Sequence, residues 1–240
     1  MIKPDYFTQL KSDIRFNEGL HACINCGTCS AICPAAAFYN YDPKQIATQV
    51  QSRNEQVIEN LLKSDTIWYC GECMSCKTRC PRGNTPGLII MALRQLSIET
   101  GFFAESEKGR QILALKRVIG SNILNYGYCV HVEGISSEMH PEQGPIWKWI
   151  RKHAEKVYNR LGANYGKEGP GALRKISDSN LKELDQIFQV TGAYDRFDKI
   201  EKFSKKKATE MGYNTKIESM DPYFLMIYRH NSEKHYKQKA

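Results

Sequence analysis

Residues 23–34 read CINCGTCSAICP, and residues 70–81 read CGECMSCKTRCP. Both stretches follow the spacing C-x2-C-x2-C-x3-C-P, and together they contain eight of the nine cysteines in the chain. Each cysteine of the first stretch recurs 47 positions later in the second, as Cys23 does at Cys70. The chain therefore contains an internal two-fold repeat that is anchored on cysteines.

This spacing is the ligand run of bacterial ferredoxins that hold two 4Fe–4S clusters. In those proteins three closely spaced cysteines ligate one cluster, and the cysteine before the proline ligates the other. The sequence therefore predicts two 4Fe–4S clusters whose crossed ligands join the halves into one unit. The first cluster takes Cys23, Cys26, Cys29 and Cys80, and the second takes Cys70, Cys73, Cys76 and Cys33.

Zinc and disulfides are the alternatives for these cysteines. Zinc ribbons use paired C-x2-C knuckles with four ligands per ion, whereas each half here has three cysteines in tight series plus a fourth before proline. Disulfides belong to oxidising compartments, and regular spacing in a reducing one indicates metal ligands. Iron–sulfur ligation is favoured over both. Clusters with a purely structural role remain an alternative to clusters that relay electrons.

The chain lacks the motifs of a catalytic subunit. No two cysteines are adjacent, so the Cys-Cys-Gly element of special catalytic clusters is absent. With thiolates matched to every iron, no iron is open to substrate. Neither a G-x-G-x-x-G fingerprint nor a Walker loop is present. We expect no catalytic residue and no further cofactor in a chain that moves electrons.

The sequence also gives general expectations for residues near the cysteine runs and for the ninth cysteine. Trp68 and Tyr69 precede Cys70 and are expected to shield a cluster from water, which tunes its potential. Gly27 and Gly71 are expected to let backbone amides approach the cluster sulfurs. The ninth cysteine, Cys129, is expected to be a buried thiol, because free cysteine behaves as a small hydrophobe.

Apolar periodicity and capping residues predict a mostly helical chain. Asp42–Pro43 and Thr85–Pro86 each combine an N-cap with a proline at the first helical position. The aromatic stretch 126–132 is expected to be extended, and the charged tail 233–240 to be disordered. Helices are expected over residues 5–14, 35–39, 43–63, 86–99, 106–118, 145–161, 180–190 and 193–211.

Charge and hydropathy limit the partners. The formal charge is +8, and eight thiolates around two oxidised clusters would lower it to roughly +4. The densest basic cluster, Lys205–Lys207, is expected to be a solvated helix face, so no nucleic acid is expected. No apolar run approaches the roughly 18 residues of a membrane span, and no signal peptide is recognisable. The expected compartment is the cytoplasm.

Residues 25–34, the helix opened by Pro43, and residues 68–83 resemble the C subunit of heterodisulfide reductase. The resemblance covers about residues 16–103. It implies a mainly α fold, with an alpha-helical ferredoxin domain that holds both clusters. That domain is expected within residues 1–104, and a mostly helical extension that docks partners within 105–240.

The resemblance also implies a function. In that family the C subunit passes electrons between an A subunit with flavin and clusters and a catalytic B subunit with Cys-Cys-Gly motifs. The long extension is similar to C subunits of sulfur-oxidising bacteria, whose complexes act on sulfur bound to a lipoate-binding carrier protein. The alternatives are an iron–sulfur subunit of a flavin dehydrogenase (hydroxy acid, glycerol phosphate or succinate type) and a binding protein with structural clusters.

Overall fold

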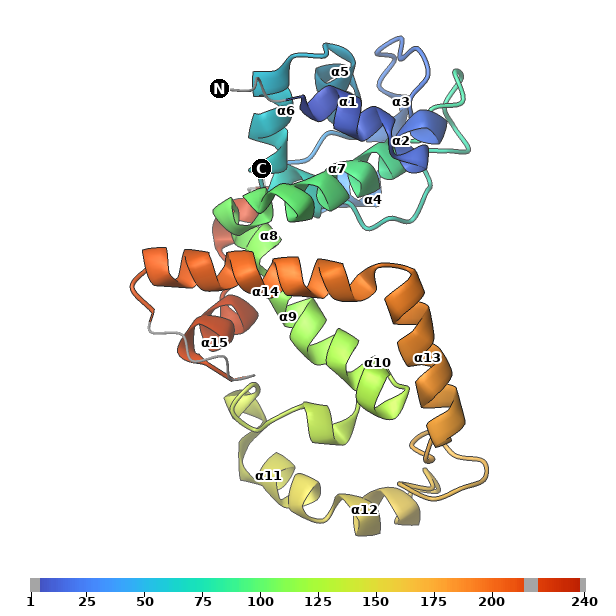
Figure 1. Ribbon diagram of the computed structural model, residues 1–240, viewed down its shortest axis with the longest axis vertical. Coiled ribbons are helices and arrows are strands. Elements are labelled where there is room, and N and C mark those ends of the chain that lie inside the picture. Colours follow the sequence, from blue (N-terminus) through green and yellow to red (C-terminus); the bar gives the residue numbers. More distant parts are fainter. Residues whose placement is uncertain (1–4, 214–219, 238–240) are drawn as a thin grey trace. The chain divides into compact units, whose positions relative to one another are not determined.

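The computed structural model describes residues 5–213 and 220–237. These residues form helices, turns and one isolated bridge, and no strand occurs among them, so the mainly α fold is confirmed. The chain divides into two compact units (Figure 1). The first unit comprises residues 1–110 with 231–240, and the second comprises 111–230. None of the helices described is long and apolar enough to cross a lipid bilayer.

The first unit consists of short helices and one long one. Its 3-10 turns span Thr66–Trp68, Phe102–Glu105 and Glu233–His235. Its α-helices are α1 (Tyr6–Lys11), α2 (Ile14–Gly19), α3 (Thr28–Ala31), α4 (Pro34–Phe38), α5 (Pro43–Gln51), α6 (Glu55–Leu62), α7 (Pro86–Thr100) and α8 (Glu107–Arg110).

Capping explains where these helices start and stop. The Asp42 carboxylate accepts the N–H groups of Lys44 and Gln45, which opens α5 as expected. The expected helix over 43–63 is wrong, because Arg53 adopts a φ of 57° and Asn54 caps a separate α6. The expected helix over 5–14 is wrong for a similar reason, since an internal aspartate at position 13 caps α2.

Helix α7 is the centre of the first unit's core. Ile89, Ile90 and Leu93 are fully buried, and α7 packs against α1, α2, α5 and α6. Each such side chain contributes about 1.5–3 kcal/mol by leaving water. The helix ends at Gly101, whose φ of 82° suits glycine. The cysteine loops are therefore attached to a rigid core.

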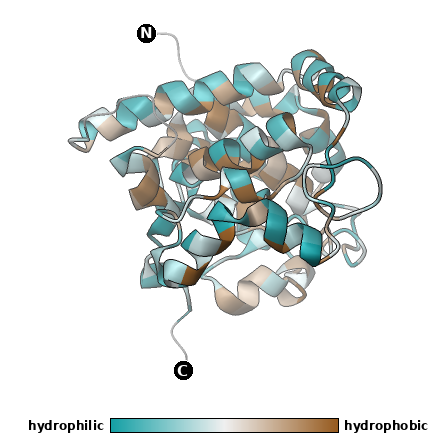
Figure 2. Ribbon diagram, turned by 90° about the horizontal axis from the view of Figure 1, so that it is seen from below, coloured by the Kyte–Doolittle hydropathy of each residue, from teal (hydrophilic) through white to brown (hydrophobic). Residues whose placement is uncertain are grey.

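The second unit is built from two long helices and several short ones. Figure 2 shows that most helices carry both hydrophilic and hydrophobic residues, as expected of elements with one buried face. The elements are α9 (Ile112–Leu115), a π-helical turn (Lys116–Gly120), α10 (Ser121–Tyr126), 3-10 turns at Val132–Gly134 and Pro141–Gln143, α11 (Gly144–Lys152), α12 (Ala154–Arg160), α13 (Asp178–Val190), α14 (Ala193–Glu210) and α15 (Pro222–Arg229).

A partly buried ion network connects three elements of the second unit. The Arg117 guanidinium donates to Glu201 at 2.7 Å and to Asp221 at 2.8 Å, which links the π-helical turn to α14 and to the start of α15. The expected helix over 145–161 divides at His153, and the expected helix over 106–118 divides into α8, α9 and the turn.

Two further expectations for local structure are wrong. Residues 126–132 contain no strand, because Gly127 ends α10 with a φ of 74° and the Tyr126 and His131 rings stack at 4.0 Å. The tail is ordered through residue 237, and its His235 is only 1% exposed. Residues 238–240 lie outside the described residues.

Candidate metal centre

The structure brings the first predicted ligand set together. Cys23, Cys26, Cys29 and Cys80 line one pocket in the first unit, although Cys80 belongs to the second run. Lys44 and Ala47 of α5 and Pro86 of α7 complete its wall. All four cysteines carry free thiols, as ligation of a cluster requires. The donors present here therefore fit an iron–sulfur cluster.

Three members of the second predicted set also lie close together. Burial raises the pKa of the Cys76 thiol most, and the neighbouring Cys70 and Cys33 thiols raise it further. Cys33 reaches this group from the N-cap of α4 in the first run. Cys73 lies at the exposed side of its loop. Cys76 also adds to the raised pKa of Cys29, after burial and Cys23, so the two sets approach each other at these two thiols.

The loop backbone repeats with the same offset as the cysteines. Asn25 has a φ of 58° and its counterpart Glu72 one of 54°; Gly27 has a φ of 79° and its counterpart Met74 one of 57°. A left-handed conformation costs a non-glycine residue about 1–2 kcal/mol, so its recurrence shows that the loops need it. Gly71 has no positive φ, so the left-handed conformation occurs at Gly27 and not at Gly71. That these two glycines let backbone amides approach the cluster sulfurs stays a prediction.

A side-chain hydroxyl lies within hydrogen-bond distance of one exposed sulfur in each run. The Thr28 hydroxyl lies 3.4 Å from Cys26 Sγ, and the Ser75 hydroxyl lies 3.3 Å from Cys73 Sγ. These hydroxyls, helped by backbone N–H groups, lower the pKa of both thiols. A lowered pKa favours the thiolate, which is the form that binds metal.

Backbone amides reach the other sulfurs. The Asn84 N–H donates to Cys80 Sγ at 3.2 Å, and the Glu72 N–H donates to Cys70 Sγ at 3.4 Å. Hydrogen bonds to sulfur are one of the means by which a protein sets a cluster's potential.

Aromatic rings flank the second set. Tyr69 stacks on Tyr39 with ring centres 4.9 Å apart, and it meets Tyr41 edge-on at 6.3 Å. Burial raises the pKa of Tyr41 above its ordinary range, and the adjacent Cys70 sulfur raises it further. Burial likewise raises the pKa of Tyr69 to about 12. Neutral aromatic side chains thus lie on this flank. That Trp68 and Tyr69 shield a cluster from water stays a prediction.

The chain is similar to known iron–sulfur proteins. The family described as 4Fe-4S dicluster domain matches residues 19–84. The C subunit of ferredoxin:CoB-CoM heterodisulfide reductase from Methanosarcina acetivorans is 34% identical over 204 residues, which are 84% of this chain and 73% of that protein. The chain belongs to the family of heterodisulfide reductase C subunits. An iron–sulfur C2 subunit of CoB-CoM heterodisulfide reductase from Methanocaldococcus jannaschii is 28% identical over 58% of this chain and 71% of its own length.

Membership confirms the cofactors and the general role. This member of the C-subunit family carries two 4Fe–4S clusters and is an iron–sulfur electron-transfer subunit of heterodisulfide reductase type. The ligand assignment, residue by residue, stays a prediction.

Sequence reasoning missed Arg94 and was wrong about Cys129. Arg94 of α7 donates to the carbonyls of Ile67 at 2.8 Å and Cys70 at 2.7 Å, and its guanidinium lies over the Trp68 ring. The only signal in the sequence is one arginine within an apolar helix.

Cys129 of the second unit is exposed, because it lies in the bends that replace the expected extended stretch.

Proposed function

We propose that this subunit relays electrons through two crossed clusters between an A-type flavoprotein and a B-type catalytic subunit. The first cluster is ligated by Cys23, Cys26, Cys29 and Cys80, and the second by Cys70, Cys73, Cys76 and Cys33. The proposal rests above all on Cys80, which leaves its own run to line the pocket of the first.

Crossed ligation suits a relay. It fixes the two clusters to one rigid frame, in which the Cys29 and Cys76 thiols are near enough to influence each other. The clusters supply the redox chemistry. The residues of this chain hold the clusters at constant separation, donate hydrogen bonds to their sulfurs and exclude water from them.

The test is a potentiometric titration of the intact complex, followed by EPR. Two reducible 4Fe–4S signals from this subunit, with magnetic coupling between them, are expected. Two clusters that stay silent at every accessible potential would overturn the relay and favour a structural role. A partner that co-purifies and contains Cys-Cys-Gly motifs would identify the B-type subunit; a flavin dehydrogenase in its place would contradict the assignment.

We assign partner docking to the extension, residues 105–240, and within it to α11 and α12. Ile146 is 72% exposed, Trp149 55% and Leu161 74%. Five basic residues and one acidic residue lie between positions 144 and 161. An apolar centre with a basic rim fits an acidic protein surface that offers an apolar pocket.

Matched variants can test this docking surface. Trp149→Ala should weaken assembly about tenfold or more, because exposed tryptophans are frequent hot spots. Leu115→Ala removes an apolar side chain of similar exposure (52%) elsewhere in the second unit and should leave assembly unchanged. Equal effects of the two variants would contradict the assignment. Binding to anionic vesicles, with no effect of Trp149→Ala on assembly, would do so as well.

A role in sulfur-compound oxidation, with a lipoate-binding carrier protein, is the finer part of the proposal. The length of the extension does not support it over other roles, since an alignment of 204 residues with a methanogen protein necessarily includes much of the extension. Electron transfer from a reduced or sulfur-loaded lipoyl carrier to the purified complex would support it. Turnover with a heterodisulfide alone would contradict it. We place the complex in the cytoplasm, where thiols stay reduced.

A further inference from the structure

The chain returns to the first unit after the second unit is complete. Residues 231–237, here called the C-terminal strap, lie against α4 and the residues that follow it. The Lys237 N–H donates to the Phe38 carbonyl at 2.8 Å, Tyr236 forms an antiparallel bridge with Tyr39, and their ring centres lie 5.3 Å apart. The strap thus extends the aromatic cluster beside the second cysteine set.

His235 connects the strap to the residue before Cys70. Its side chain is 1% exposed, and its Nδ1 lies 2.6 Å from the Tyr69 hydroxyl. Its Nε2 lies 3.1 Å from Glu107 Oε1, at an angle unsuited to a good hydrogen bond. The buried imidazole thus lies between the Tyr69 hydroxyl and the Glu107 carboxylate, and it connects the Tyr69 ring to the strap.

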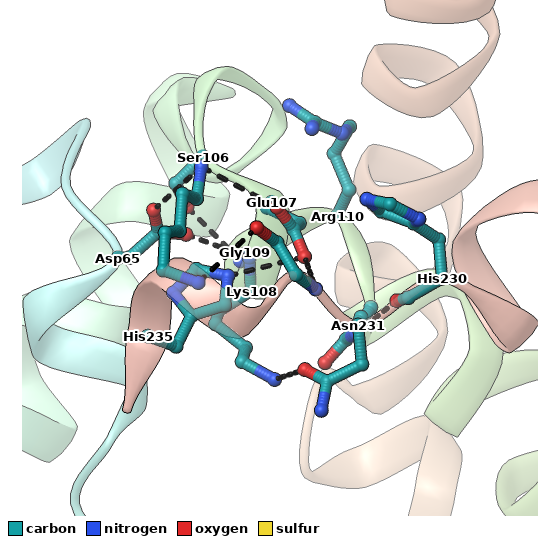
Figure 3. Close-up of polar contacts among 12 residues, drawn as sticks. Asp65, Ser106, Glu107, Lys108, Gly109, Arg110, His230, Asn231 and His235 are labelled. Carbon is teal, nitrogen blue, oxygen red and sulfur yellow. Dashed lines mark hydrogen bonds and ion pairs between the residues drawn. The ribbon is translucent and has the colours of Figure 1, made fainter. Parts of the chain in front are cut away.

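Glu107 anchors the strap from the other side (Figure 3). Its carboxylate accepts the Ser232 N–H at 2.7 Å and lies 3.3 Å from Lys234 Nζ. Burial raises the pKa of Glu107, but the bonds and charges of Ser232, His235 and Lys234 outweigh burial and lower it to about 2. The carboxylate is therefore ionised at neutral pH, and it holds three strap residues at once.

The segment that leads into the second cysteine run, residues 65–69, also contacts the residue beside Glu107. Asp65 accepts the Lys108 N–H at 2.8 Å, next to Glu107, and Tyr69 lies four residues further along. The strap, the start of α8 and the segment that leads into Cys70 therefore form one polar assembly.

We infer that the C-terminal strap holds an aromatic wall (Tyr39, Tyr41 and Tyr69) over the second cluster, with His235 as the residue that positions it. By keeping water from this flank, the strap sets the second cluster's reduction potential apart from that of the first. This inference rests on the proposed ligand set of the second cluster.

The sign of the effect follows from charge. A 4Fe–4S core of about +2 with four thiolates carries about −2 when oxidised and −3 when reduced. A low dielectric penalises the more highly charged form, so burial makes reduction harder. Loosening the wall should therefore move the second cluster to a less negative potential, and it should expose that cluster to chelators and oxygen.

The experiment compares paired substitutions in the full-length chain within its complex. His235→Ala removes the positioning imidazole, and Tyr69→Phe removes only the hydroxyl that it holds. The control for the first is His140→Ala in the second unit, which removes an imidazole whose Nε2 lies 2.9 Å from the Tyr228 hydroxyl. The control for the second is Tyr6→Phe, which removes a hydroxyl that lies 3.4 Å from Glu59 Oε2 in the first unit. Iron and sulfide content and EPR redox titration are the measurements.

Both test variants should retain two clusters. In both, the potential of the second cluster should move to a less negative value, more for His235→Ala than for Tyr69→Phe, while the first cluster and both controls stay unchanged. Unchanged potentials would overturn the inference, and so would equal shifts of the two clusters. If His235→Ala loses its clusters altogether, Tyr69→Phe decides alone. Two titrating clusters in the parent complex would uphold the relay even where the inference about the strap fails.

Discussion

The two cysteine runs have one sequence pattern and two environments. Both place a hydroxyl at the sulfur of the second cysteine and left-handed residues at matching positions. Around the first set lie the beginnings of α5 and α7. Around the second set lie tyrosines, an arginine from α7 and the C-terminal strap.

The comparison distinguishes the residues that hold a cluster from the surroundings that set its reduction potential. A local spacing of cysteines suffices to build the loop that holds a cluster, which is why the loop recurs almost unchanged after 47 residues. The surroundings come from distant parts of the chain, and they differ even at matching positions: Gly27 has open space beside it, whereas its counterpart Met74 packs against Gly87. From the asymmetry of the surroundings we expect the two chemically equal clusters to have different potentials.

The largest expected effect comes from breaking the crossed ligation. Cys80→Ser should remove the cluster that Cys23, Cys26 and Cys29 share with it, because a serine hydroxyl is a poor substitute for the thiolate. About half of the bound iron and sulfide should be lost, and the EPR signal of the second cluster should remain. The mirror variant Cys33→Ser should remove the second cluster and leave the first. Loss of the second cluster alone in Cys80→Ser would show that each run ligates its own cluster.

The next effect concerns the second unit as a whole. Lys108 bonds to the side chain of Asn231, so the two places where the chain leaves and re-enters the first unit are close together. Replacing residues 111–230 by a short glycine–serine linker should leave both clusters at their parental potentials and abolish assembly with partners. Cutting the chain after about residue 105 should also leave two clusters and weaken assembly. That cut removes the strap as well, so only in that variant should the second cluster's potential shift.

Assembly can be measured by co-purification of the partners, and potentials by EPR titration. Normal assembly of the linker variant would show that the extension is not the docking element. In the chain cut after residue 105, a second cluster with the same reduction potential as in the unaltered chain would contradict the proposed role of the strap.

How far the sequence predicts this structure depends on how local each feature is. The cysteine loops, the α5 start at Asp42 and the α7 end at Gly101 are set by neighbouring residues, and all were predictable. The break at Arg53 was not, because its apolar stripe continues across it and only Asn54 signals a new cap.

The aromatic wall and the strap are features that single-sequence reasoning cannot reach. The tail 233–240 is charged, which indicates disorder, yet the carboxylate of Glu107, more than a hundred residues away, holds its backbone and cations. Cys129 was predicted to be buried from the residue type alone, whereas the bends after Gly127 leave it exposed. Features that arise from long-range pairing leave no local pattern.

A smaller effect, on stability, should follow from adding a side chain at Gly109, which packs beside Trp68 near the second cysteine run. A Cβ on Gly109 would lie 2.2 Å from the Phe103 carbonyl and 2.9 Å from Trp68 Nε1. Gly109→Ala should therefore destabilise the first unit by about 1–3 kcal/mol, measured by chemical denaturation. In the control Gly71→Ala the added Cβ meets no protein atom within 4 Å, and stability should change by less than about 0.5 kcal/mol. Equal stability of the two variants would show that the contact at Gly109 relaxes without cost.

The smallest expected effect tests whether the two loops are equal once their surroundings are set aside. Thr28→Val and Ser75→Ala each remove the hydroxyl beside an exposed cluster sulfur. A hydroxyl that donates to sulfur stabilises the reduced cluster more, since that form carries more negative charge, so both losses should move a potential to more negative values. Thr28→Val should shift only the first cluster and Ser75→Ala only the second, by similar amounts, in an EPR redox titration. Because both sulfurs are solvent-facing, water competes for them and keeps the shifts below those of the strap variants. A much larger shift for one hydroxyl would mean that the asymmetry of the surroundings extends into the loops themselves.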